Sequence, residues 1–158
     1  MRRLGSIAAL VLVLAPPAEE PFRVFVTSSA RGDPSVVETI DEGRVELENR
    51  IRKKKKSFVL AEVREEADVV IDLQAYWKRE QWKAHTEIRR SATASHAIDV
   101  NEVEEHHSLL AIVTILGTQR QMTGAQIKKS GASVKGAARD LLAQIERYLK
   151  DNHLRKFR

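Results

Sequence analysis

Residues 68–79 read DVVIDLQAYWKR, and the fold can be worked out from this segment. Apolar side chains occupy every second position, which is the period of an extended strand. They are Val69, Ile71, Leu73, Ala75 and Trp77. Such alternation is typical of a sheet with one face on the core and the other in water. The water-facing side of this predicted strand then carries Asp72, Gln74, Tyr76 and Lys78.

The segments before this strand predict a strand, a helix and a second strand. Residues 21–28 alternate and predict a first strand. Asp33 followed by Pro34 is typical of a helix start, because aspartate caps the free N–H groups and proline suits the first turn. Arg52 and Lys53–Lys56 close the helix, and residues 57–60 predict a short strand.

The segments after it predict further strands and a closing helix. Residues 82–103 alternate weakly and predict a polar hairpin partner strand near a sheet edge. Residues 102–107 predict a charged turn, and residues 109–117 a central strand that is apolar on both faces. Residues 126–132 predict a polar loop. Ser133 then caps a helix whose apolar stripe continues to Leu149.

The order of these elements predicts an α+β fold. Two helices pack on one face of a mixed, largely antiparallel sheet of about four to five strands. After residues 1–18, the remaining residues 19–158 form a single domain with a basic tail, 153–158.

Residues 1–18 have the three parts of a secretory signal peptide. Arg2 and Arg3 precede an uncharged apolar run, 4–14, and Ala15-Pro16-Pro17-Ala18 follows. The run is shorter than the roughly 20 residues of a membrane-spanning helix. Two outcomes stay open: cleavage after Ala18, or retention of the leader as an anchor, because Pro16 fits a cleavage site imperfectly. We expect a periplasmic or secreted protein without a membrane span after cleavage.

The amino-acid composition excludes several kinds of chemical site and one class of partner. The sequence has no cysteine, which excludes disulfides, thiolate nucleophiles and cysteine-based zinc sites. The full chain has a net charge of +5, and residues 19–158 carry 25 Lys and Arg against 22 Asp and Glu. This mild positive charge is compatible with an anionic partner. Nucleic acid is not an expected partner, because aromatic residues are 5% and no recognised motif is present.

Four short segments resemble a group of bacterial envelope domains. They are residues 22–26 (FRVFV), 58–60 (FVL), 67–71 (ADVVI) and 137–141 (AARDL). The chain resembles the amino-terminal domain of TolB, the curli-secretion lipoprotein and the lipoprotein activators of penicillin-binding proteins. The resemblance implies a scaffold that binds proteins in the envelope. The chain departs from the lipoproteins of this group because it lacks their acylated cysteine.

The candidate interaction surface is the water-facing side of the 68–79 strand together with the next tryptophan. Its residues are Asp72, Gln74, Tyr76, Lys78 and Trp82. Trp77 falls on the predicted core side. Exposed aromatic side chains favour protein interfaces. A second candidate surface, for anionic lipid or another polyanion, is the lysine run Lys53, Lys54, Lys55 and Lys56.

Histidines and glutamates gather between residues 85 and 107. The densest group is Glu104, His106 and His107, which we keep as a weak candidate for a metal site. It is weak because adjacent histidines on a strand point to opposite faces and could not easily bind the same ion. His85 and Glu87 lie two residues apart, and His96 is similarly near Asp99, but the sequence shows neither the reach nor the tuned pKa that a general acid–base pair needs. A metal-dependent or acid–base hydrolase using residues 85–107 stays open as an alternative function.

The leading expectation is a non-enzymatic exported domain that binds another component of the cell envelope. No catalytic set is recognisable, and no cofactor is expected. The expected partner is an envelope protein. The alternatives are the hydrolase and an electrostatic binder acting through Lys53–Lys56.

Overall fold

The computed structural model describes residues 19–90, 95–154 and 156–157. The predicted leader, 1–18, lies outside these residues. The elements are the strands β1 (Glu19–Glu20), β2 (Phe22–Ser28), β3 (Phe58–Leu60), β4 (Val69–Arg90), β5 (Ser95–Ile115), β6 (Thr118–Lys128) and β7 (Lys156–Phe157), and the helices α1 (Pro34–Lys53) and α2 (Val134–Asp151). A single 3-10 turn, Arg64–Glu66, precedes β4.

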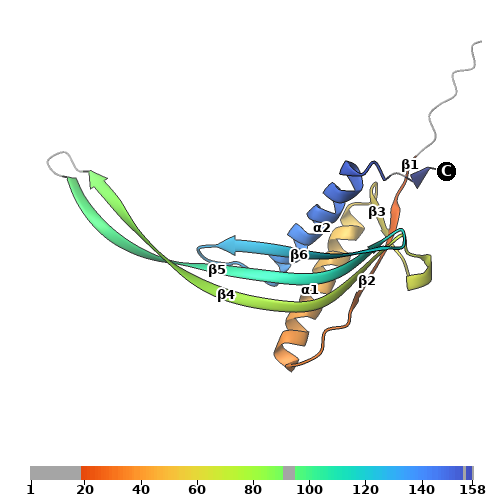
Figure 1. The fold of residues 1–158 in the computed structure, drawn as a ribbon, viewed down its shortest axis with the longest axis horizontal. Coiled ribbons are helices and arrows are strands. Elements are labelled where there is room, and N and C mark those ends of the chain that lie inside the picture. The colour runs from red at the N-terminus through yellow and green to blue at the C-terminus, as the bar shows by residue number, and fades with distance from the viewer. Residues whose placement is uncertain (1–18, 91–94, 155, 158) are drawn as a thin grey trace, which may run out of the picture.

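Five strands form the main sheet in the order β3-β2-β4-β5-β6. β2 runs parallel to β3 and to β4, whereas β4, β5 and β6 pair as an antiparallel meander. α1 and α2 lie side by side and cover one face of this sheet (Figure 1). The predicted α+β class, with two helices on one face of a mixed sheet, is confirmed. β1 and β7 pair with each other in a separate two-stranded sheet.

Both helices begin at the residues that the sequence predicts. The Asp33 side chain accepts a hydrogen bond from the Ser35 N–H at 2.8 Å, and Pro34 occupies the first turn of α1. The Ser133 side chain accepts from the Gly136 N–H at 3.3 Å and caps α2. Each cap satisfies a backbone donor that the first helical turn leaves free.

The core lies between the helices and the sheet. It combines the apolar stripes of α1 and α2 with alternate residues of β2, β4 and β5. Fully buried members include Ile40, Leu47, Ile71, Leu73, Leu109, Leu141 and Ile145. α2 approaches β6 closely at Gly124, whose α-carbon faces Ala137 and Leu141. The Gln144 side chain of α2 also donates to the Thr123 carbonyl at 2.9 Å.

A β-bulge at Gln74 overturns the predicted faces of β4. Leu73 pairs with Ala111, but Ala75 pairs with Leu110, so Gln74 is an extra residue on β4. The extra residue exchanges the two faces beyond it. Tyr76 therefore packs against the core and Trp77 lies on the open face, 43% exposed. The prediction that Trp77 is core and Tyr76 faces water is wrong.

The strands β4, β5 and β6 also correct three local predictions. Residues 82–90 continue β4 and residues 95–103 begin β5, so the segment 82–103 spans both strands of a hairpin. Residues 102–107, for which a charged turn is predicted, lie inside β5. β6 continues to Lys128, into the segment 126–132 for which a loop is predicted.

Candidate functional site

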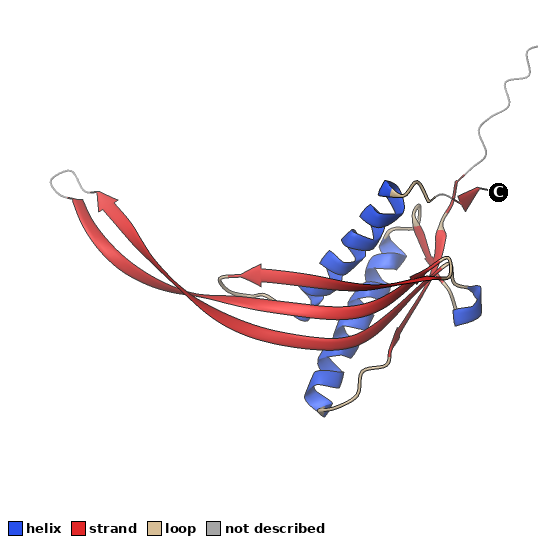
Figure 2. Ribbon diagram, in the orientation of Figure 1, coloured by secondary structure: helices blue, strands red, loops and turns tan. Residues whose placement is uncertain are grey.

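The two longest strands, β4 and β5, extend beyond the rest of the fold. β6 accompanies β5 only as far as the pair Glu105–Lys128, whereas β4 and β5 stay paired to Arg90 and Ser95. We call residues 81–90 and 95–104 the arm. At about 3.3 Å per residue, its ten paired positions span roughly 33 Å. Figure 2 shows this two-stranded ribbon projecting well past both helices.

One side of the arm continues the core side of the sheet and is largely uncharged. Cross-strand partners share a side, and Trp82 pairs with Val103. We call this the apolar side of the arm after its residues Trp82, Ala84, Ile88, Ala97 and Val103; Thr86, Asp99, Asn101 and Arg90 also lie on it. The Trp82 side chain is 71% exposed and the Ile88 side chain 65%. The polar Thr86 and Asp99 of this side satisfy each other with a hydrogen bond of 2.8 Å.

The opposite side of the arm carries charges. We call it the charged side, consisting of Lys83, His85, Glu87, Glu102 and Glu104. Lys83 Nζ lies 2.8 Å from Glu104 Oε2, and Lys129, just after β6, lies 2.7 Å from Glu102 Oε1. His85 Nε2 lies 3.4 Å from Glu87 Oε1. Ile98 and Val100, the cross-strand partners of Glu87 and His85, also lie on this side. The charges are therefore concentrated on this side of the arm, and the two most exposed bulky apolar side chains, Trp82 and Ile88, lie on the other.

The five residues of the predicted interaction surface do not share a face. Asp72 lies on the open face, where its carboxylate accepts a hydrogen bond from Ser29 Oγ at 2.7 Å. Gln74 is the bulge residue. Tyr76 and Lys78 lie on the core side, and Lys78 pairs with Glu105 at 3.0 Å. Trp82 lies farther out on the same side, at the base of the arm. This separation follows from the bulge.

Tyr76 and His107 meet on the core side of the sheet, before the arm begins. Tyr76 Oη lies 2.7 Å from His107 Nδ1. The His107 ring is 8% exposed, and its Nε2 atom has no hydrogen-bond partner within the described ranges. Burial lowers the pKa of the His107 imidazole, with smaller effects from Glu105, which opposes the shift, and Lys78, which adds to it. His107 therefore favours the neutral form in the folded chain.

This burial predicts that acid destabilises the fold through His107. In the unfolded chain the imidazole has its ordinary pKa, about 6.5. As the pH falls below that value, the unfolded state takes up the proton before the folded state does, so the free energy of unfolding decreases. Below the folded-state pKa this contribution stays constant. Urea unfolding of the wild type and of His107→Phe between pH 7.5 and 5 checks this. The variant should lose less stability over that interval, and equal losses would contradict the assignment.

The predicted metal group Glu104, His106 and His107 is not one site. His106 Nε2 lies 3.6 Å from Glu104 Oε2 on the open side of the sheet. His107 lies on the other side, against Tyr76. His96 and Asp99 also lie on opposite sides of the arm, because they are three positions apart along a strand and successive side chains alternate between its sides.

A different group brings metal-binding side chains together. One ligand atom each from His85, Glu87 and Glu102 lies within 4.8 Å of the others. His85 and Glu87 belong to β4 and Glu102 to β5. The close spacing of His85 and Glu87 is visible in the sequence, but Glu102 joins them only through the cross-strand register.

The lysine run lies at the end of α1. Lys54 forms an ion pair with Glu146 of α2, which ties the two helices together at this end. Lys53, Lys55 and Lys56 are exposed. The predicted group is thus divided into one structural lysine and three that face water.

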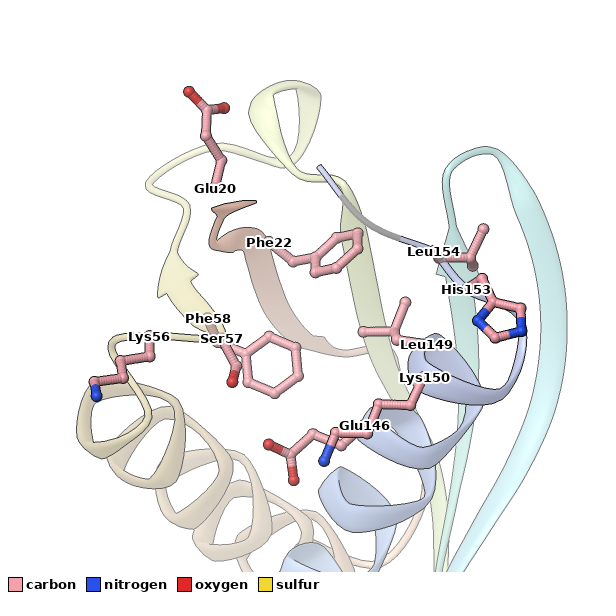
Figure 3. A pocket seen from close by; sticks show the side chains of 10 residues that line it. All are labelled: Glu20, Phe22, Lys56, Ser57, Phe58, Glu146, Leu149, Lys150, His153 and Leu154. Carbon is pink, nitrogen blue, oxygen red and sulfur yellow. The ribbon is translucent and has the colours of Figure 1, made fainter. Parts of the chain in front are cut away.

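A pocket of about 330 Å³ opens near this end of the helices. Its walls come from β2, β3 and the end of α2, with Phe22, Phe58 and Leu149 at its apolar part (Figure 3). The charged and titratable groups of the lining are Glu20, Lys56, Glu146, Lys150 and His153. Because Glu146 already pairs with Lys54, the two lysines outnumber the one other carboxylate of the lining.

Within residues 19–90, 95–154 and 156–157, no helix combines the length and apolar character needed to cross a membrane.

Comparisons with known proteins give structural likeness only. No family model matches the chain, and no curated protein matches it. Among solved structures, a PelC dodecamer from Paraburkholderia phytofirmans is similar at a TM-score of 0.42 and 10% identity, over 82% of this chain and 88% of that chain. The hypothetical protein CT253 from Chlamydia trachomatis is similar at a TM-score of 0.45 and 11% identity, over 81% of this chain and 98% of that chain.

Proposed function

We propose that this chain is an exported, non-enzymatic interaction domain of the bacterial cell envelope, and that it binds a partner protein through the apolar side of the arm. The exposure of Trp82 and Ile88 on this side is the observation that supports the proposal. The helices cover the same side of the sheet as far as Tyr76 and leave the arm beyond it uncovered.

The physical reason is that a two-stranded ribbon whose apolar side chains face water gains little stability from them. A two-stranded ribbon is at best marginally stable in water, and it gains stability when its apolar side is buried. Tryptophan is a frequent energetic centre of protein interfaces because it buries a large, rigid surface. A partner that covers Trp82 and Ile88 would remove both side chains from water and hold the arm in place.

The arm also offers backbone groups to a partner. In the part of the chain that the structure describes, the arm has only two strands, since β6 ends before it begins. The outer edges of such a ribbon can accept an extended strand from another protein through main-chain hydrogen bonds. The predicted leader at residues 1–18 and the resemblance to envelope domains support the cell envelope as the place of this contact.

The test is site-specific photocrosslinking in the native cell. A photoreactive residue at position 82 or 88 is expected to give one discrete adduct. Position 116 is the matched control, because Leu116 is also exposed, at 55%, but lies at the turn between β5 and β6. Equal crosslinking at positions 88 and 116, or none at 82 and 88, would contradict the proposal.

Substitution of the same side chains supplies a quantitative prediction. Trp82→Ser combined with Ile88→Ser should weaken binding to the crosslinked partner by about 30-fold or more, as expected when a central aromatic contact is lost. The melting temperature should change little, because both side chains are exposed in the free chain. Titration of the purified partner by calorimetry gives the affinity. Leu116→Ser should leave that affinity unchanged.

A further inference from the structure

We propose that the charged side of the arm binds a divalent transition-metal ion, of which Zn²⁺ is the best fit, through His85, Glu87 and Glu102. Each of these residues offers one ligand atom, and the three atoms lie within 4.8 Å of one another. The site is separate from the apolar side of the arm, so it does not depend on the proposed protein contact.

The spacing agrees with metal coordination. Zinc binds histidine nitrogen and carboxylate oxygen at about 2.1 Å in a tetrahedral arrangement, which puts neighbouring ligand atoms roughly 3.4 Å apart. His85 Nε2 and Glu87 Oε1 already lie 3.4 Å apart. Since all three ligand atoms lie within 4.8 Å of one another, the Glu102 carboxylate has to approach by at most about 1.4 Å, which a glutamate achieves by rotations of its side chain.

The chemistry of the ligand set selects the type of ion. One imidazole and two carboxylates suit Zn²⁺ and its neighbours among the divalent transition metals, whereas Mg²⁺ and Ca²⁺ prefer oxygen ligands throughout. The two carboxylates also neutralise the charge of the ion. The side chains are reachable from water, with 41% of His85 and 42% of Glu87 exposed, so the remaining coordination positions are open to water.

Lys129 competes with the ion for Glu102. Its Nζ atom lies 2.7 Å from Glu102 Oε1, and the lysine is exposed at the surface, where such a pair contributes little. A divalent ion that binds Glu102 has to displace this ammonium group. Removal of Lys129 should therefore strengthen metal binding, a result that a merely structural role of Glu102 would not produce.

The ion would connect the two strands of the arm. His85 and Glu87 come from β4 and Glu102 from β5, so coordination links the strands across the ribbon. Binding should stabilise paired strands over separated ones, because the ligand set exists only when the strands are in register. Amide hydrogen exchange in the arm should slow when the metal is added, while exchange in α1 and α2 should not change.

Calorimetric titration of the untagged full chain with ZnCl₂ tests the site, with circular dichroism to confirm that each variant is folded. We expect one ion per chain. His85→Gln and Glu102→Gln should each weaken binding by about tenfold or more. The matched controls are His96→Gln and Glu104→Gln, a histidine and a glutamate of the same arm outside the ligand set, and each should change the affinity less than about twofold. Lys129→Met should strengthen binding.

Three results would overturn the proposal. The first is absence of one-to-one binding. The second is equal weakening by Glu104→Gln and Glu102→Gln, which would mean that the ion responds to the general negative charge of the arm. The third is weaker binding in Lys129→Met, since that lysine would then assist rather than compete. Slower amide exchange in the arm of the wild type, with no change in His85→Gln, would support the assignment independently.

Discussion

Gly124→Ala is expected to lower the free energy of unfolding by about 3 kcal/mol, the upper part of the usual range for overpacking. A β-carbon built at Gly124 would lie 2.1 Å from the Ala137 carbonyl oxygen and 2.8 Å from the Leu141 backbone nitrogen. Both contacts are with the backbone of α2, which cannot rotate away as a side chain does. The methyl group would therefore force α2 away from β6.

The measurement is urea unfolding followed by circular dichroism. Gly136→Ala is the matched control, because a β-carbon there would meet the side chain of Gln126 in place of a helix backbone. That side chain can rotate, at the cost of its hydrogen bond from the Ser133 N–H. Alanine in a helix gains about 1 kcal/mol over glycine, which offsets this loss. If the two variants were equally stable, the close approach of α2 to β6 at Gly124 would be disproved.

Leu109→Ala is expected to cost about 3–4 kcal/mol, and Gly43→Ala should recover part of this loss. Leu109 is fully buried in the inner strand β5, so its truncation loses apolar burial and leaves a cavity. A β-carbon at Gly43 of α1 would lie 3.1 Å from Leu109 Cδ2. In the wild type this contact is tight. Without the leucine methyl groups, the alanine methyl enters vacated space.

A double-mutant cycle checks this second prediction. In the wild type, Gly43→Ala should change stability by no more than about 1 kcal/mol, because the gain in helix propensity opposes the tight contact. In the Leu109→Ala background the tight contact with Leu109 is gone, so the gain in helix propensity from Gly43→Ala outweighs the remaining crowding. The double variant should therefore be more stable than the sum of the two single effects predicts, by about 1 kcal/mol. Additive effects would show that Gly43 and Leu109 do not share this space.

The arm and the adjoining residues 105–107 are the part of the fold for which the sequence pattern was least informative. Residues 102–107 carry three glutamates and two histidines, a composition that predicts a turn. They form a strand because one side of the ribbon is open to water and because their charges find partners across it. Lys83 with Glu104 and Lys78 with Glu105 are examples. A strand that makes few contacts with the core does not need a regular alternation of apolar and polar residues.

Only part of the candidate metal site can be predicted from the sequence. The two-residue spacing of His85 and Glu87 is enough to put them on one side of a strand. Glu102 is fifteen residues further along the chain from Glu87 and reaches them only because Lys83 pairs with Glu102 and His85 with Val100. Cross-strand register is a property of two paired strands and includes the bulge at Gln74, so it cannot be read from one strand alone.

By itself, the sequence determined the helices and the fold class. Asp33, Pro34 and Ser133 act through hydrogen bonds and backbone angles within one helical turn, and the apolar stripes act through a period of about 3.6 residues, so both signals are local. The tertiary structure alone decided which side of β4 faces the core beyond Gln74 and how far the arm extends. A bulge is an extra residue relative to a partner strand, and it therefore exists only once β4 and β5 are paired.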